Sequence, residues 1–234
     1  MSLYKSIPDP FVGKNPIPAG APGFYEREEI FVYIQDLLRA GESVSLVGER
    51  KAGKTSFLNY LLVHLATDEF IPILVDAQRV IPKKDKIFLG RLITKAAEKI
   101  AEKVGSTEPI KMDTPTIEPD EKVYEAFEND LEQLRAVLPL NSNGQKCRLI
   151  WLIDEIETLR SYEKTELFVF LRPLAQGDPN FRLVVAGYDV LYTYLLPTSW
   201  DCSLTRYQGS AISCNLCQPR QITVMPGSPS RLRP

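Results

Sequence analysis

The strongest structural signal in this chain is the segment Gly48-Glu49-Arg50-Lys51-Ala52-Gly53-Lys54-Thr55. It matches the pattern G-x-x-x-x-G-K-[ST], in which two glycines let the backbone wrap closely around a phosphate group. A short β-type run, 43–47, precedes it, and a helical run from Lys54 to about Ala66 follows. Inward-pointing N–H groups and a helix N-terminus together attract anions. The segment therefore predicts a phosphate-binding loop between a strand and a helix.

The positions of this loop have separate expected roles in binding a nucleoside triphosphate, ATP. Lys54 is expected to reach the β- and γ-phosphates, and the Thr55 hydroxyl is expected to coordinate Mg²⁺. Between the glycines the backbone matters more than the side chains, although Arg50 and Lys51 add positive charge. The other expected contacts to ATP come from Gly48, Glu49, Arg50, Lys51, Ala52, Gly53 and Ser56.

A second element lies about 100 residues further on, at Leu149-Ile150-Trp151-Leu152-Ile153-Asp154-Glu155. It reads as a buried strand that carries a carboxylate to its C-terminal tip, where open parallel sheets bind ligands. Asp154 is expected to hold Mg²⁺ through water, and Glu155 to orient or deprotonate the attacking water. An apolar run that ends in acids often marks only a strand end, but a preceding phosphate loop favours the functional interpretation.

The type of nucleotide can also be inferred from the sequence. It contains no N-K-x-D motif of the kind that reads guanine, and no glycine follows Asp154 at the spacing of a GTPase switch loop. GTPases also lack the adjacent acid that Glu155 supplies. ATP is therefore expected rather than GTP.

Strands alternate with helices along most of the chain. Apolar residues at helical spacing predict helices at 26–39, 87–104, 120–138 and 162–175, with Asp120 as a possible cap. Apolar runs predict strands at 70–76, 149–153 and 181–186. This alternation predicts an α/β fold with a mostly parallel sheet that has helices on both faces.

The two ends of the chain differ in composition from its middle part. This difference predicts the domain organisation. Residues 1–23 are rich in proline and are expected to form an extended arm, and residues 24–200 form the domain. Residues 201–234 have no lysine and no glutamate, and are expected to form an irregular tail that is altered or truncated. Cys214 and Cys217, with Cys202 nearby, could bind zinc, but free thiols are the more common state of such a set.

Composition excludes several classes of protein. The 234 residues carry a net charge of −2, so no broad basic field indicates nucleic acid as a partner, although binding stays possible. No apolar run is long enough for a membrane span, and the N-terminus has no signal-peptide core, so a cytoplasmic protein without membrane contact is expected. A Ser-His-Asp enzyme would need His64, the single histidine, which lies in an apolar helical run.

The order of these motifs resembles the AAA-like ATPase domain of the STAND group and its archaeal and bacterial relatives. The likeness covers about residues 10–198 and rests on Phe24-Tyr25-Glu26-Arg27-Glu28-Glu29, the phosphate loop and the Asp-Glu strand. It implies a three-layer P-loop NTPase fold of the additional-strand class, with Phe24 and Arg27 at the adenine. Glu26 stands where the family box has glycine.

The resemblance also carries implications for other segments and for function. Strand 183–186 would lie beside Asp154, and Arg160 or Arg172 could act in trans, against the plainer interpretation of solvated helix arginines. The implied function is a slowly hydrolysing signalling switch that self-associates and acts on a protein effector of unknown identity. A DNA-associated ATPase and a non-hydrolysing nucleotide-binding scaffold stay open as alternatives.

Overall fold

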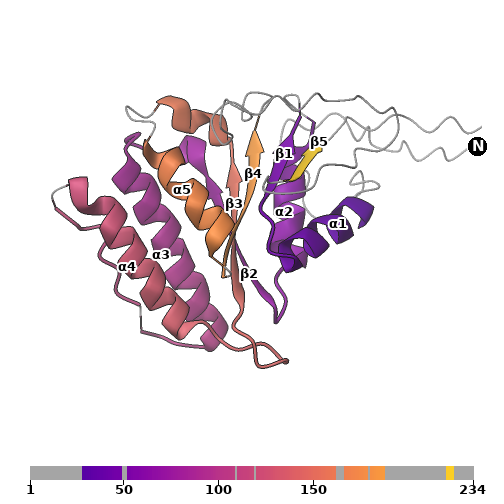
Figure 1. Cartoon of the computed structure of the whole chain (residues 1–234), viewed down its shortest axis with the longest axis horizontal. Helices are drawn as coiled ribbons and strands as arrows, with labels where there is room; N and C mark the ends of the chain where they lie inside the picture. Colours follow the sequence, from indigo (N-terminus) through magenta and orange to yellow (C-terminus); the bar gives the residue numbers. More distant parts are fainter. Residues whose placement is uncertain are drawn as a thin grey trace, which may run out of the picture.

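The computed structural model describes residues 28–48, 52–108, 110–118, 120–161, 166–178, 180–187 and 220–223. Its centre is a five-stranded sheet in the order β2-β3-β4-β1-β5, in which every neighbouring pair is parallel (Figure 1). β4 therefore separates β1 from β3. The strands are β1 (Val44–Val47), β2 (Phe70–Asp76), β3 (Arg148–Asp154), β4 (Phe181–Gly187) and β5 (Arg220–Thr223).

Helices cover both faces of this sheet, as Figure 1 shows. One face carries α1 (Glu28–Arg39) and α2 (Lys54–His64), and their buried side chains form one apolar cluster with the sheet. The other face carries α3 (Asp85–Val104), α4 (Val123–Val137) and α5 (Glu166–Gly177), which build a second, larger cluster. The predicted α/β architecture with three layers is confirmed.

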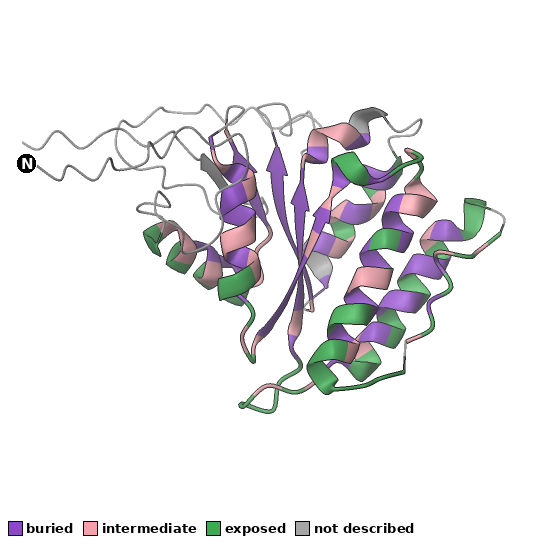
Figure 2. Ribbon diagram, turned by 180° about the vertical axis from the view of Figure 1, so that it is seen from behind, coloured by how far each residue is buried: buried purple, intermediate pink, exposed green. Residues whose placement is uncertain are grey.

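Strands β1 to β4 are largely buried on both faces because their side chains alternate between the two sides of the sheet (Figure 2). In β3, Leu149, Trp151 and Ile153 pack toward α3 and α5, whereas Ile150 and Leu152 pack toward α1 and α2. All five side chains are fully buried. This explains why the most apolar run in the sequence becomes a central strand.

Three local features differ from the sequence expectations. Asp120 does not cap α4, because residues 120–122 form a 3₁₀ turn and Lys122 takes the N-cap position without a side-chain hydrogen bond. The Asp120 carboxylate instead lies 3.4 Å from Lys86 Nζ. A 3₁₀ segment, Ile156–Ser161, precedes α5, and β5 adds a strand from within the expected tail.

The length and apolar character of the described helices can be compared with what a membrane span requires. None of the helices in the described ranges combines the length and the apolar character that a bilayer crossing requires. His64, which the sequence placed on an apolar helix, is exposed near the end of α2, where its ring stacks on Tyr60 with centroids 3.9 Å apart.

Candidate nucleotide-binding site

The phosphate loop lies where β1 ends and α2 begins, as the sequence predicts. Gly53 is the N-cap of α2 and has φ 83°, a left-handed conformation that glycine adopts at little cost. The buried Lys54 side chain turns back over the loop, and its Nζ donates a hydrogen bond to the Gly48 carbonyl at 2.7 Å. Ala52 and Ser56 are also buried. The lysine ammonium and the N-terminus of α2 therefore bring positive charge to one place.

Asp154 faces this loop from the neighbouring part of the sheet. It is the last residue of β3, it is buried, and its carboxylate accepts a hydrogen bond from the Thr55 hydroxyl. Burial raises the pKa of Asp154, and the hydrogen bond from Thr55 opposes this rise. Folding thus joins two residues that are 99 positions apart in sequence, because β3 and the start of α2 meet at the carboxyl edge of the sheet.

Glu155 occupies a sharp turn directly after β3. Its φ of 52° is left-handed, which is uncommon for a residue with a side chain and often marks a functional position. Its N–H donates to Asp154 Oδ1 at 3.0 Å, and its carbonyl accepts from the Thr158 N–H at 2.9 Å and the Thr158 hydroxyl at 2.8 Å. These bonds hold the backbone that carries the Glu155 carboxyl group.

Two further acids at this edge were not singled out by the sequence analysis. Asp76 is the last residue of β2 and lies opposite Asp154 in the register of β2 and β3. The charge of Asp76 raises the pKa of Asp154 further. Glu157 shares a side-chain hydrogen bond with Glu155, and burial together with this neighbour raises the pKa of Glu155. Asp76 carried the same signal as Asp154, an apolar run ending in aspartate. Glu157 carried none, since only the turn after β3 brings it to Glu155.

The oxygen groups at this edge suit a magnesium ion. Mg²⁺ prefers oxygen ligands and is usually held by one or two protein groups together with phosphate oxygens and water. The Thr55 hydroxyl and the Asp154 carboxylate provide such a pair within hydrogen-bond reach of each other. The described part of the chain contains no set of three or more His, Cys, Asp or Glu side chains arranged around a metal.

Several predicted site residues lie outside the described ranges. These are Glu49, Arg50 and Lys51 of the loop, Phe24 and Arg27 of the adenine box, and the cysteines Cys202, Cys214 and Cys217. The side chain of Arg160 is likewise not described, and Arg172 is half-buried on α5. β4, the expected sensor strand, does lie beside β3, with Ile153 opposite Val185.

Comparisons with known proteins were made for sequence and for structure. No protein-family model matches the sequence, and a search of curated proteins finds no match. Among solved structures, the Walker-type ATPase PABY2304 of Pyrococcus abyssi superposes with a TM-score of 0.49 at 18% identity, over 74% of this chain and 48% of that chain. The ORC1 protein of Aeropyrum pernix, solved in complex with DNA, superposes with a TM-score of 0.46 at 17% identity, over 73% of this chain and 41% of that chain.

This chain thus spans about half the length of the first of these structures. The likeness is distant, so the assignment of the fold depends on the chain's own topology. A phosphate-loop sequence lies between β1 and α2, the acid-tipped strand is β3, and β4 stands between them. The chain therefore has the fold of the P-loop NTPases, in the class with an additional strand.

Proposed function

We propose that this chain binds ATP with Mg²⁺ and hydrolyses it slowly to ADP and phosphate. The observation that carries the proposal is the hydrogen bond between the Thr55 hydroxyl and the Asp154 carboxylate, next to the N-terminus of α2. Neither the Thr55 hydroxyl at the start of α2 nor the Asp154 carboxylate at the end of β3 is needed to pack these two elements together. A metal-bound triphosphate accounts for both.

Each residue of the proposed site has a role that its surroundings support. Lys54 exchanges its bond to the Gly48 carbonyl for the β- and γ-phosphates, and Thr55 and Asp154 hold the magnesium ion. The loop amides and the α2 N-terminus stabilise the negative charge that builds up on phosphate. Such preorganised groups contribute most where water is excluded.

Glu155 is proposed as the general base that orients and deprotonates the attacking water. Burial and the neighbouring Glu157 raise its pKa, which makes its carboxylate a stronger base near neutral pH. The left-handed backbone at Glu155 supports this role, because strained conformations cluster at functional sites.

In the proposed biological role, slow turnover makes the bound nucleotide a signal rather than a source of energy. The chain would act as a nucleotide-controlled signalling switch on a protein effector. Self-association would supply an arginine to the nucleotide of a neighbouring copy. These finer assignments depend on the resemblance described above.

Isothermal titration with ATP and GTP, with and without Mg²⁺, tests the binding part of the proposal. The expected result is Mg²⁺-dependent binding of ATP. Lys54→Ala should weaken it by about 10- to 150-fold, the value of one charged hydrogen-bonding group. The matched control is Lys99→Ala on the outer side of α3, which should bind like the unaltered chain. Equal binding by both variants would refute the assignment of the loop.

Phosphate release on the same samples tests hydrolysis. Glu155→Gln should bind ATP normally but lose turnover by about 100- to 10,000-fold, whereas the exposed control Glu98→Gln should keep it. Unaltered protein that binds ATP without releasing phosphate would be a nucleotide-binding scaffold. Release that rises with added duplex DNA and falls steeply with salt would instead indicate a DNA-associated ATPase.

A further inference from the structure

Helix α5 has two apolar faces, one buried in the core and one that the described residues cover only in part. Leu167, Leu171 and Ala175 point into the core. A second row at helical spacing, Val169, Phe170, Pro173 and Leu174, is half-buried or exposed, and Val169 is 72% exposed. A surface helix normally turns polar side chains outward, so this second row needs another explanation.

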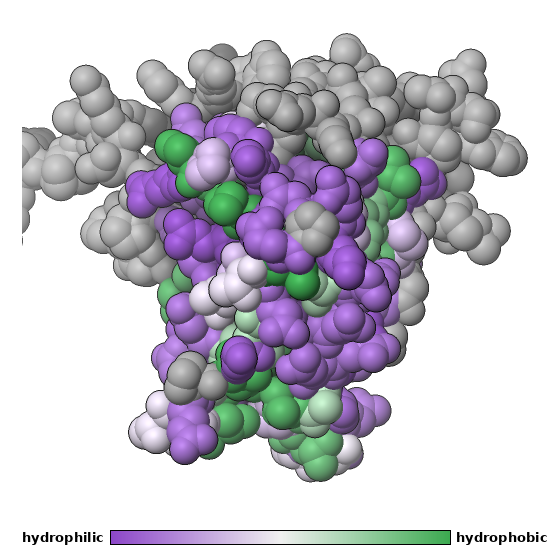
Figure 3. All heavy atoms as spheres, turned by 90° about the vertical axis from the view of Figure 1, so that its left-hand side faces the viewer, coloured by the Kyte–Doolittle hydropathy of each residue, from purple (hydrophilic) through white to green (hydrophobic). Residues whose placement is uncertain are grey.

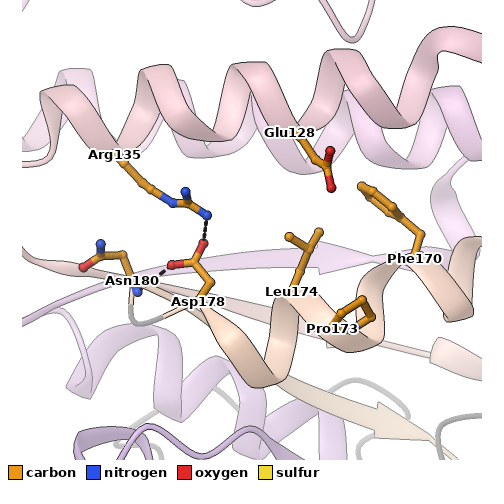
Figure 4. A pocket seen from close by; sticks show the side chains of 7 residues that line it. All are labelled: Glu128, Arg135, Phe170, Pro173, Leu174, Asp178 and Asn180. Carbon is orange, nitrogen blue, oxygen red and sulfur yellow. Dashed lines mark hydrogen bonds and ion pairs between the residues drawn. The ribbon is translucent and has the colours of Figure 1, made fainter.

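Phe170, Pro173 and Leu174 of this row form one wall of a groove between α4 and α5, with a cavity volume of about 480 Å³. Val169 lies one turn before Pro173 at the edge of this wall. Figure 4 shows Phe170, Pro173 and Leu174 on α5 facing Glu128 and Arg135 on α4. Arg135 forms an ion pair with Asp178, which closes one end of the groove. At the other end, the Glu128 carboxylate and the Phe170 ring point toward the same space (Figure 4). The groove thus has an apolar wall with an acid opposite.

The rim of the groove carries negative charge. Glu125, Glu128 and Glu132 are exposed on one side of α4, and none of the three forms an ion pair within the described ranges. The outward surface of α3 and α4 is mainly hydrophilic (Figure 3). The groove therefore suits a ligand that has apolar groups and donates hydrogen bonds from positive charge.

We propose that this groove docks a segment of a partner protein that combines apolar side chains with arginine or lysine. The apolar side chains would lie against Phe170, Pro173 and Leu174, and a cationic group would lie between Glu128 and the Phe170 ring. Such a cation gains from the carboxylate and also from the face of the aromatic ring. A nucleic acid would be repelled by the acidic row. The proposal does not depend on nucleotide binding.

Fluorescence anisotropy with the full chain tests this proposal. The probe is a labelled helical peptide of about 16 residues, with leucines at i and i+4 spacing and arginines beside them, and the matched peptide has glutamate in place of arginine. We expect saturable binding of the arginine peptide only. The double substitution Glu128→Gln with Glu132→Gln should weaken binding by roughly 2- to 10-fold at low salt, and less at high salt.

Val169→Lys should weaken binding further, since it places a positive charge at the exposed edge of the apolar wall, beside Phe170. The controls are Val63→Lys, at an exposed site on α2 across the sheet, and the exposed Glu98→Gln on α3; both should bind like the unaltered chain. Lys54→Ala should also bind the peptide normally, which separates this site from the nucleotide site. Equal binding of both peptides, no saturable binding, or normal binding by the groove variants would overturn the proposal.

Discussion

Replacing Thr55 by valine tests the central contact of the nucleotide site without any ligand. Valine keeps the shape of threonine but removes the hydroxyl that donates to Asp154. Asp154 is only 6% exposed, so water cannot replace the lost donor. A hydrogen bond to a charged group contributes about 1.5–3 kcal/mol. At about 2–4 °C per kcal/mol for a chain of this size, Thr55→Val should lower the unfolding temperature by about 3–12 °C.

Urea and thermal unfolding followed by circular dichroism measure this effect. The loss should shrink as the pH falls through the folded-state pKa of Asp154, since the neutral carboxyl group needs the donor less. Thr55→Ser keeps the hydroxyl and should keep most of the stability and the Mg²⁺-dependent binding of ATP. Thr116→Val, at an exposed site, should change the free energy of unfolding by less than about 0.5 kcal/mol. If Thr55→Val is as stable as the unaltered chain near neutral pH, the Thr55–Asp154 contact is not formed in solution.

Three further predictions concern buried charge and backbone. Burial raises the pKa of Asp154 above 3.8, so its contribution to stability is present below the unfolded-state pKa and is lost as the pH rises through the folded-state pKa. Asp154→Asn should therefore raise the urea midpoint of the nucleotide-free chain near neutral pH, while Mg²⁺-dependent binding of ATP is lost. A lower urea midpoint would contradict the raised pKa of Asp154. Gly41 has φ +86°, and a Cβ there would lie 2.8 Å from Arg182 Nη2. Gly41→Ala should lower the free energy of unfolding by about 1–3 kcal/mol in urea titrations, and a neutral result would contradict the left-handed backbone at this position. The fully buried Asp130 accepts hydrogen bonds from the Asp113 N–H and from the N–H and hydroxyl of Thr114; Asp130→Ala should cost about 2–5 kcal/mol in thermal unfolding, with Asp130→Asn closer to the unaltered chain.

Much of the fold could be predicted because its signals are local. The strand at 70–76 and the start of the helix at Lys54 agree with the structure residue for residue. The apolar run that becomes β3 was assigned to within a residue or so at each end. The predictions fail where contacts between distant parts of the sequence set the local structure. Asp120 reads as a cap, yet the lysine at 86 on another helix attracts its carboxylate. β5 has only four residues and is recognisable as a strand only through its pairing with β1.

For the site, local sequence patterns predict the types of residue and their order: a glycine-bounded loop before a lysine and a threonine, and an acid at the end of an apolar run. Such patterns are local, because a turn, a helix start and a buried strand each depend on neighbouring residues. The turn after β3 brings Glu157 to Glu155, although nothing in the sequence marks Glu157. Tertiary packing brings the Thr55 hydroxyl to Asp154 and leaves an apolar row on α5 beside the acids of α4. These contacts join segments through the order of strands and the packing of helices, and burial then sets the pKa of each acid.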